Sequence, residues 1–151
     1  MTDPIDLEVK KTHVKKQPAF NGLNEEELET LSGLLVEKHF APGQTIVNEG
    51  DPVDSVYLIV SGTADVRHIR IKDNKPEIEH LATLGPNTAI GLNESGFYSL
   101  SGIRTATVVA NEDMVTLRLS VAVFHGFTLS NSHVSRAMRK HAESIIGWNK
   151  S

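Results

Sequence analysis

One carboxylate and one guanidinium stand at the two ends of a short polar segment. Glu94 and Arg104 belong to the stretch NESGFYSLSGIRTAT, residues 93–107, whose other members are small, hydroxylic or aromatic. A guanidinium is a planar fork that matches the oxygens of a phosphate, and backbone N–H groups in a turn rich in Gly, Ser and Asn add further donors. A carboxylate accepts hydrogen bonds from a ribose hydroxyl. The segment therefore predicts a site that holds both halves of a nucleotide.

The elements that must position this segment are short strands. Runs of β-branched and apolar residues, separated by turn clusters, predict strands at 45–47, 55–60, 63–71, 77–84, 105–110 and 114–119. Such spacing is typical of a sandwich or barrel rather than of a parallel α/β sheet. The run Val56-Tyr57-Leu58-Ile59 predicts a strand that is buried on both faces, and Gly50 and Gly62 are expected at turn positions with unusual backbone angles.

Two motifs in this region resemble those of cyclic nucleotide-binding domains. Glu94, Gly96, Phe97 and Tyr98, followed by the run Arg104-Thr105-Ala106-Thr107, resemble the family's phosphate-binding cassette. Residues 46–51 and 56–59 and Gly62, with residues 40–43 ahead of them, resemble the family's hairpin motif. The resemblance spans about Phe20 to Trp148 and implies a mainly β fold with flanking helices. That fold is a double-stranded β-helix, a jelly-roll-like β-roll, with N- and C-terminal helices.

The resemblance also implies the ligand and the residues that bind it. Arg104 and backbone N–H groups are expected to bind a cyclic phosphate, Glu94 a ribose hydroxyl, and Thr105 a base edge, which in the family inclines toward guanine. The ligand-binding residues expected on this basis are Gly91, Asn93, Glu94, Ser95, Arg104, Thr105 and Ala106. Asn93 stands where the family has a glycine, and Gly91 lies two residues upstream, as if Leu92 and Asn93 were inserted. If Gly91 set the register, Leu92 would hold the ribose-contact position; the distance to Arg104 favours Glu94.

The N-terminal part of the chain divides into an arm and a helix. Residues 1–17 are polar and rich in lysine, which predicts a mobile or loosely docked arm ahead of a single domain at 18–151. Asn24 and Glu27 form a capping-box pattern that predicts the start of a helix. Leucines at helical spacing from Leu28 to Leu35 predict that it packs on a sheet, and Ala41-Pro42-Gly43 is expected to end it.

The C-terminal part predicts a further helix, at about 132–148, after a short apolar run at 121–127. Its apolar seam has heptad spacing and consists of Val134, Met138, His141, Ile145 and Trp148. Two alternatives are open: the seam packs on the chain's own β-roll, or it pairs with the same helix of a second chain to form a homodimer. The resemblance to the family implies a third alternative, in which Met138 or Trp148 covers the ligand as a lid.

Composition excludes several classes of protein. The 151 residues suit one domain, and 15 Lys+Arg against 19 Asp+Glu give a formal charge of −4, which favours neither nucleic acid nor an anionic membrane as a partner. Without cysteine, disulfides and thiolate chemistry are excluded. The sequence has neither a signal-peptide pattern nor a long apolar run, so we expect a cytoplasmic protein.

No pattern in the sequence predicts catalysis or metal binding. His68 and His80 lie in strands that are expected to pair, as in a metal-binding cupin, but the clustered spacing of metal ligands is missing. Nucleophile elbows, phosphate loops and paired carboxylates are also missing. We therefore expect no catalytic residues, no metal and no cofactor, and a protein that is not an enzyme.

The expected function is that of a regulatory module that binds cAMP or cGMP. Only three residues follow Trp148, so the output is expected from an effector protein or a second copy. The alternative is a degenerate domain that no longer binds nucleotide and serves as a protein-protein interaction scaffold.

Overall fold

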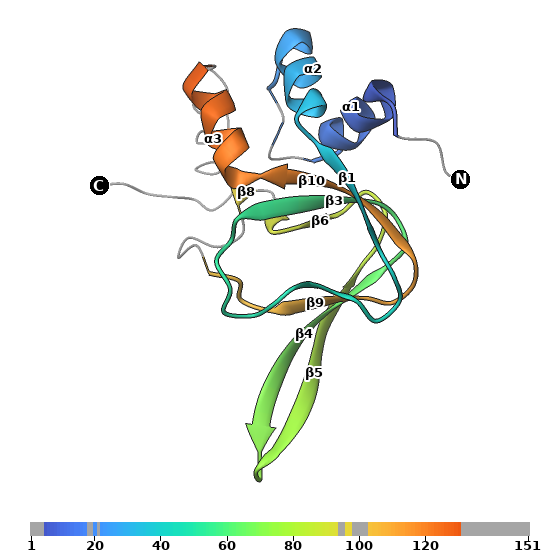
Figure 1. Ribbon diagram of the computed structural model, residues 1–151, viewed down its shortest axis with the longest axis vertical. Coiled ribbons are helices and arrows are strands. Elements are labelled where there is room, and N and C mark those ends of the chain that lie inside the picture. Colours follow the sequence, from blue (N-terminus) through green and yellow to red (C-terminus); the bar gives the residue numbers. More distant parts are fainter. Residues whose placement is uncertain (1–4, 18–19, 21, 94–95, 98–102, 131–151) are drawn as a thin grey trace.

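Two antiparallel sheets form the centre of the molecule. The computed structural model describes residues 5–17, 20, 22–93, 96–97 and 103–130. One sheet has the strand order β1-β10-β3-β6 and the other β2-β9-β4-β5, with β7 and β8 as a separate pair (Figure 1). The strands are β1 (Val36–Phe40), β2 (Thr45–Val47), β3 (Ser55–Ser61), β4 (Ala64–Lys72), β5 (Lys75–Leu84), β6 (Ala89–Ile90), β7 (Leu92–Asn93), β8 (Gly96–Phe97), β9 (Thr107–Ala110) and β10 (Met114–Ser120). The predicted mainly β roll is confirmed.

Strand β3 is buried on both faces, as its apolar run predicts. Tyr57 and Ile59 pack between the two sheets, in a cluster that also contains Val108 and Met114. Val56 and Leu58 point the other way, into a second cluster beneath the helices. Successive side chains of a strand face opposite sides, so a strand between two apolar layers must be apolar at every position.

Three helices cover the outer face of the β1-β10-β3-β6 sheet (Figure 1). They are α1 (Leu7–Lys15), α2 (Glu25–Gly33) and α3 (Val121–Ser130). Their buried side chains include Val14, Leu31 and Phe124, which pack against the sheet in one cluster. No helix in the described ranges has the length and apolar character needed to cross a bilayer.

Helix α1 corrects the prediction of a mobile or loosely docked arm. Asp6 caps it, because its side chain accepts a hydrogen bond from the backbone N–H of Val9. Val14 is fully buried, and the Lys10 ammonium donates to the backbone carbonyl of Leu35 at 2.9 Å. The polar composition of this segment describes the solvent face of a docked helix rather than a free arm.

Helix α2 starts as predicted but ends earlier. The capping box is present, with Asn24 accepting from the backbone N–H of Glu27 and Glu27 accepting from that of Asn24. The helix ends at Gly33, whereas the leucine pattern predicts its end near Ala41. Residues 36–40 instead form β1 and pair with β10, because the partner strand stabilises the extended conformation over local helix propensity. At the C-terminal side, 121–130 form α3, and the predicted helix at 132–148 lies outside the described residues.

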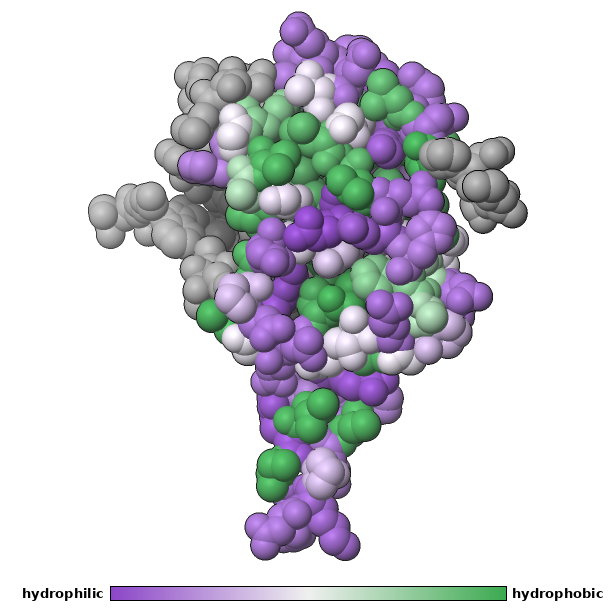
Figure 2. All heavy atoms as spheres, viewed as in Figure 1, coloured by the Kyte–Doolittle hydropathy of each residue, from purple (hydrophilic) through white to green (hydrophobic). Residues whose placement is uncertain are grey.

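The β4–β5 hairpin projects beyond the rest of the molecule (Figure 1). Its turn consists of Asp73 and Asn74, both with positive φ, so β5 begins two residues before the predicted start at Glu77. Apolar side chains gather on the projecting part (Figure 2), and Ile71 there is 73% exposed. At the base of the hairpin, Gly62 has a φ of +87°, and a Cβ there would collide with the Asp113 carbonyl, so this glycine is required, as predicted.

The burial of His13 in α1 predicts a pH-dependent stability. Burial, with Lys16 as a second cause, lowers the pKa of His13, and its Nδ1 has no hydrogen-bond partner among the described residues. The unfolded chain therefore binds this proton more readily than the folded one. The resulting stability is present above the unfolded pKa, about 6.5, and is lost as the pH falls through the folded pKa.

We expect the free energy of unfolding to fall between pH 7.5 and 5.5 less steeply in His13→Gln than in the wild type. Denaturant unfolding at a series of pH values measures this difference. His39→Gln, at an exposed position of β1, is the control and should keep the His13 contribution. Equal slopes in wild type and His13→Gln would contradict the prediction.

Candidate functional site

A pocket of about 530 Å³ lies at the side of the β-roll. This volume falls within the range of roughly 300–1,000 Å³ that is usual for small-molecule sites. Its walls are mainly apolar, and its polar side chains are those of His68, Arg104 and Thr105. The apolar lining comes mostly from both sheets and consists of Val47, Val53, Val66, Leu81, Ala82, Leu84, Ala89, Ile90, Ala106 and Val108, with Gly91 beside them.

Arg104 is a buried cation in the wall of this pocket. The residue is 6% exposed, and its Nη2 donates to the backbone carbonyl of Ser55 at 2.6 Å. Asp54 is the one described carboxylate within ion-pair distance, at 3.9 Å from Nη2, and its own side chain is 74% exposed. Burial lowers the pKa of the Arg104 guanidinium, with Asp54 acting in the opposite direction, but arginine keeps its proton in proteins. The pocket therefore contains a desolvated positive charge that a solvent-exposed carboxylate balances only weakly.

The backbone around Arg104 is fixed by the loop between β2 and β3. The Arg104 N–H donates to the carbonyl of Asp51 at 2.7 Å, and the Arg104 carbonyl accepts from Gly50 at 2.9 Å. Ile103, the residue before Arg104, forms an isolated antiparallel bridge with Pro52 of the same loop. These contacts hold the backbone of Arg104 on both sides of its Cα atom.

Gly91 makes room for the guanidinium. Its φ is +83°, and a Cβ built on it would lie 2.6 Å from Nη1 of Arg104. Real Cβ atoms do not approach a nitrogen this closely, so any side chain at this position would displace the arginine or the backbone. The glycine is required here for both its backbone angle and its lack of a side chain.

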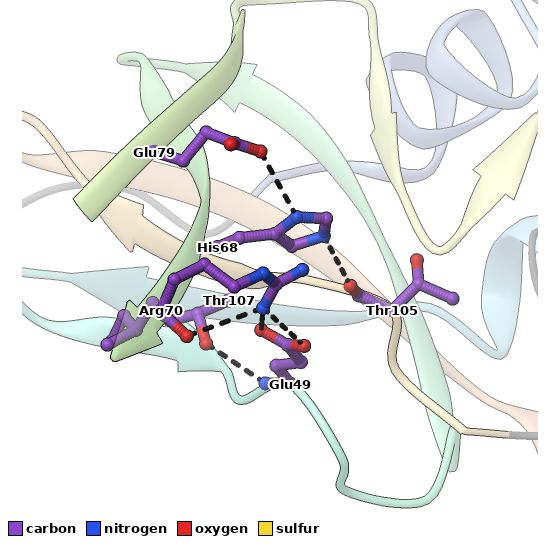
Figure 3. A network of polar contacts seen from close by, with 7 residues as sticks. Glu49, His68, Arg70, Glu79, Thr105 and Thr107 are labelled. Atoms are coloured by element: carbon purple, nitrogen blue, oxygen red, sulfur yellow. Dashed lines mark hydrogen bonds and ion pairs between the residues drawn. The ribbon is translucent and has the colours of Figure 1, made fainter. Parts of the chain in front are cut away.

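A network of polar contacts lies at the hairpin side of the pocket (Figure 3). His68 on β4 contacts the Thr105 carbonyl through Nε2 at 2.8 Å, and its Nδ1 lies 3.5 Å from Glu79 on β5. Arg70 pairs with Glu49 at 3.2 Å. The backbone N–H of Glu49 donates to the Thr107 hydroxyl at 3.0 Å. The network joins the hairpin, the β2–β3 loop and the segment that carries Arg104.

The structure brings together four of the seven residues expected to bind ligand: Gly91, Arg104, Thr105 and Ala106 line the one pocket. Asn93 lies in β7, where it pairs with Gly96 of β8. Glu94 and Ser95 lie outside the described residues, as do Met138 and Trp148. The choice between Glu94 and Leu92 as the ribose contact therefore stays a prediction.

Sequence reasoning missed several residues of the pocket wall. His68 is the polar one, and Val66 and Leu84 are apolar examples. Val66 and His68 are two residues apart on β4, so alternation along the strand places them on one face. That signal identifies a shared face but cannot show that the face lines a pocket.

The histidines of the hairpin do not converge. His68 contacts Thr105, while His80, one register position away, contacts Asp65 at 3.0 Å. Adjacent positions of a strand face opposite sides of the sheet. In the described part of the chain, no group of three or more His, Asp or Glu side chains is arranged to hold a metal ion.

Comparison with known proteins connects this geometry with a family. The model of the cyclic nucleotide-binding domain matches residues 37–131. The N-terminal domain of a transcriptional regulator from Streptomyces coelicolor A3(2) superposes with a TM-score of 0.75, at 25% identity and covering 89% of this chain and 90% of that one.

Two curated relatives are much longer than this chain. The cAMP-dependent protein kinase regulatory subunit of Yarrowia lipolytica is 29% identical over 119 residues, which cover 79% of this chain and 29% of that protein. The potassium channel GORK of Arabidopsis thaliana is 29% identical over 79 residues, 52% of this chain and 9% of the channel. The family match covers more than half of the chain. The matched residues include the strands that line the pocket and the segment that carries Arg104. The chain belongs to the cyclic nucleotide-binding domain family.

Proposed function

We propose that this chain binds a cyclic mononucleotide, cAMP or cGMP, in the pocket that Arg104 lines, and that it acts as a regulatory module. The observation that carries the proposal is the buried guanidinium: it is 6% exposed in a mainly apolar pocket of about 530 Å³. Burying a cation without a close counter-ion is costly, so such a group favours an anionic ligand.

The cyclic phosphate suits this position for chemical reasons. It is a single negative charge with two exposed oxygens, which a guanidinium contacts as a planar pair. Nη2 is directed to the Ser55 carbonyl, and Nη1 lies over Gly91. A phosphate bound beside Gly91 would contact the arginine without interference from a side chain.

The rest of the ligand would contact the apolar walls and the rim. Val66, Leu84 and Val108 offer surface for the base, since aromatic and aliphatic surfaces bury well against each other. Thr105 lies at the pocket and is exposed, so its hydroxyl is accessible to a base edge or a phosphate oxygen. In this proposal Glu94 contacts the ribose.

The regulatory part of the proposal follows from the family. One relative is named as a cAMP-dependent kinase regulatory subunit and another as a potassium channel, so similar domains occur in proteins with different outputs. We propose that ligand binding here changes contacts with an effector protein or a second copy, in the cytoplasm, and that the chain itself catalyses no reaction. The seam from Val134 to Trp148 is the proposed homodimer contact.

Replacing Arg104 should weaken the binding strongly. Arg104→Gln removes the charge and shortens the side chain, while its amide stays a neutral N–H donor. We expect it to lose roughly 2–5 kcal/mol of binding free energy, the range for truncating a buried charged contact. Calorimetric titration with cAMP and with cGMP measures the loss and identifies the preferred base.

Arg118→Gln is the matched control, because Arg118 also lies near Asp54, at 4.0 Å, but does not line this pocket. It should bind as the wild type does. If the wild type bound neither nucleotide at millimolar concentration, the proposal would be wrong and the interaction scaffold would be favoured instead.

Replacing Gly91 tests the space beside the arginine. Gly91→Ala should weaken nucleotide binding by more than its effect on stability explains, because the new Cβ displaces Nη1. Gly43→Ala is the control: Gly43 has nearly the same φ, +82°, but nothing lies within 4 Å of its Cβ position. Both variants should lose roughly 1–2 kcal/mol of stability from the left-handed backbone, measured by denaturant unfolding. Equal affinities for the two variants would contradict the crowding at Gly91.

A further inference from the structure

The segment from Arg104 to Thr107 leaves its sheet at a defined point. Strands β9 and β4 pair from Ala64↔Ala110 to Arg67↔Thr107, and the ladder ends there. If the antiparallel pairing continued, Ala106 would lie opposite His68. The sequence predicts a strand that begins at Thr105, but Thr105 and Ala106 lie outside the ladder and line the pocket instead.

His68 contacts the segment directly after the point where the ladder ends. It is the first residue of β4 beyond the last pair, and its Nε2 lies 2.8 Å from the Thr105 carbonyl. A carbonyl oxygen only accepts, so Nε2 must carry a proton and donate it. A side chain thus supplies the hydrogen bond that a backbone N–H would supply within a sheet.

The same imidazole also contacts the outer strand of the hairpin. Glu79 is the register partner of His68, and its carboxylate lies 3.5 Å from Nδ1. Figure 3 shows the ring between Glu79 on one side and Thr105 on the other. Beyond Arg67, β4 pairs with β5 but has left β9. His68 therefore stands at the junction between the projecting hairpin and the segment that carries Arg104.

On the other side of Arg104, the segment is attached to the β2–β3 loop. The two backbone hydrogen bonds with Gly50 and Asp51 fix the peptides of Arg104, and His68 fixes the next carbonyl. A guanidinium is several bonds from its Cα, so a small rotation of these peptides moves it by a larger distance. Holding the segment from both sides keeps the arginine in one position before ligand arrives, which reduces the cost of binding.

We propose that His68 is a positioning residue that connects the β4–β5 hairpin to the ligand-binding segment, so that the hairpin regulates the affinity of the pocket. The effect on ligand affinity rests on the proposed function. The positioning of the segment by His68 does not depend on it. By linkage, any partner that shifts the hairpin shifts ligand affinity, and ligand shifts the hairpin by the same free energy.

The link is tested first without ligand. Amide hydrogen exchange, followed by NMR, reports on the N–H groups of Gly50 and Arg104, whose hydrogen bonds hold the segment. We expect His68→Ala to speed exchange at both amides by about tenfold or more, because the segment opens locally. In His68→Gln the side-chain amide nitrogen takes the place of Nε2 and donates to Thr105, so exchange should stay near the wild-type rate.

The regulation is tested by titrating the same variants with cAMP and with cGMP. We expect His68→Ala to weaken binding about tenfold, as for one lost hydrogen bond, and His68→Gln to restore it although the contact with Glu79 is gone. His39→Ala is the matched control, since His39 also pairs with a glutamate, Glu37, but on β1 and away from the pocket. It should change neither exchange nor affinity.

Each outcome decides one part of the inference. Unchanged exchange in His68→Ala, or a His68→Gln variant as impaired as His68→Ala, overturns the positioning role. Faster exchange with unchanged affinity overturns the regulation of the pocket. If the wild-type protein binds neither nucleotide, the proposed function and this regulation fail together, while the exchange rates still decide whether His68 holds the segment.

Discussion

The burial of the Arg104 guanidinium is the constraint on which the site depends. A charge taken out of water must be compensated, and here the direct described contact is a neutral carbonyl, that of Ser55, with Asp54 farther away and exposed. Gly91 lies against the guanidinium, and a side chain at this position would collide with it. The surrounding walls are apolar, which strengthens electrostatic attraction within the pocket. Together these features are the grounds on which we propose an anionic ligand here.

The scaffold supports this charge through one strand. β3 is buried on both faces, with Val56 and Leu58 under the helices and Tyr57 and Ile59 between the sheets. Ser55, which binds the guanidinium, is the first residue of that strand. The arginine is therefore anchored to the most completely buried part of the core, where a shift of the acceptor would disturb both layers.

The β4–β5 hairpin belongs to the sheet at its base and projects from it at its outer part. Its base pairs with β9, and its outer part carries exposed Ile69, Ile71 and Ile78. His68 lies between the two regions and is hydrogen-bonded to the carbonyl of Thr105, in the segment that carries Arg104. In our proposal, a shift of the projecting part of the hairpin reaches the segment that carries Arg104 through His68.

Sequence alone determined those features that depend on neighbouring residues. The capping box of Asn24 and Glu27, the doubly buried run at 56–59 and the turn at Gly62 follow from local patterns, and the two motifs identified the family. The end of α2 and the docking of α1 were mispredicted, because β1 is stabilised by β10 and α1 by the core, both distant in sequence. The approach of Gly91 to Arg104, and of His68 to Thr105, depends on how far each ladder runs before its strands separate. Only the tertiary structure decided that, since strand ends are set by packing and pairing with remote partners and not by the residues at the end itself.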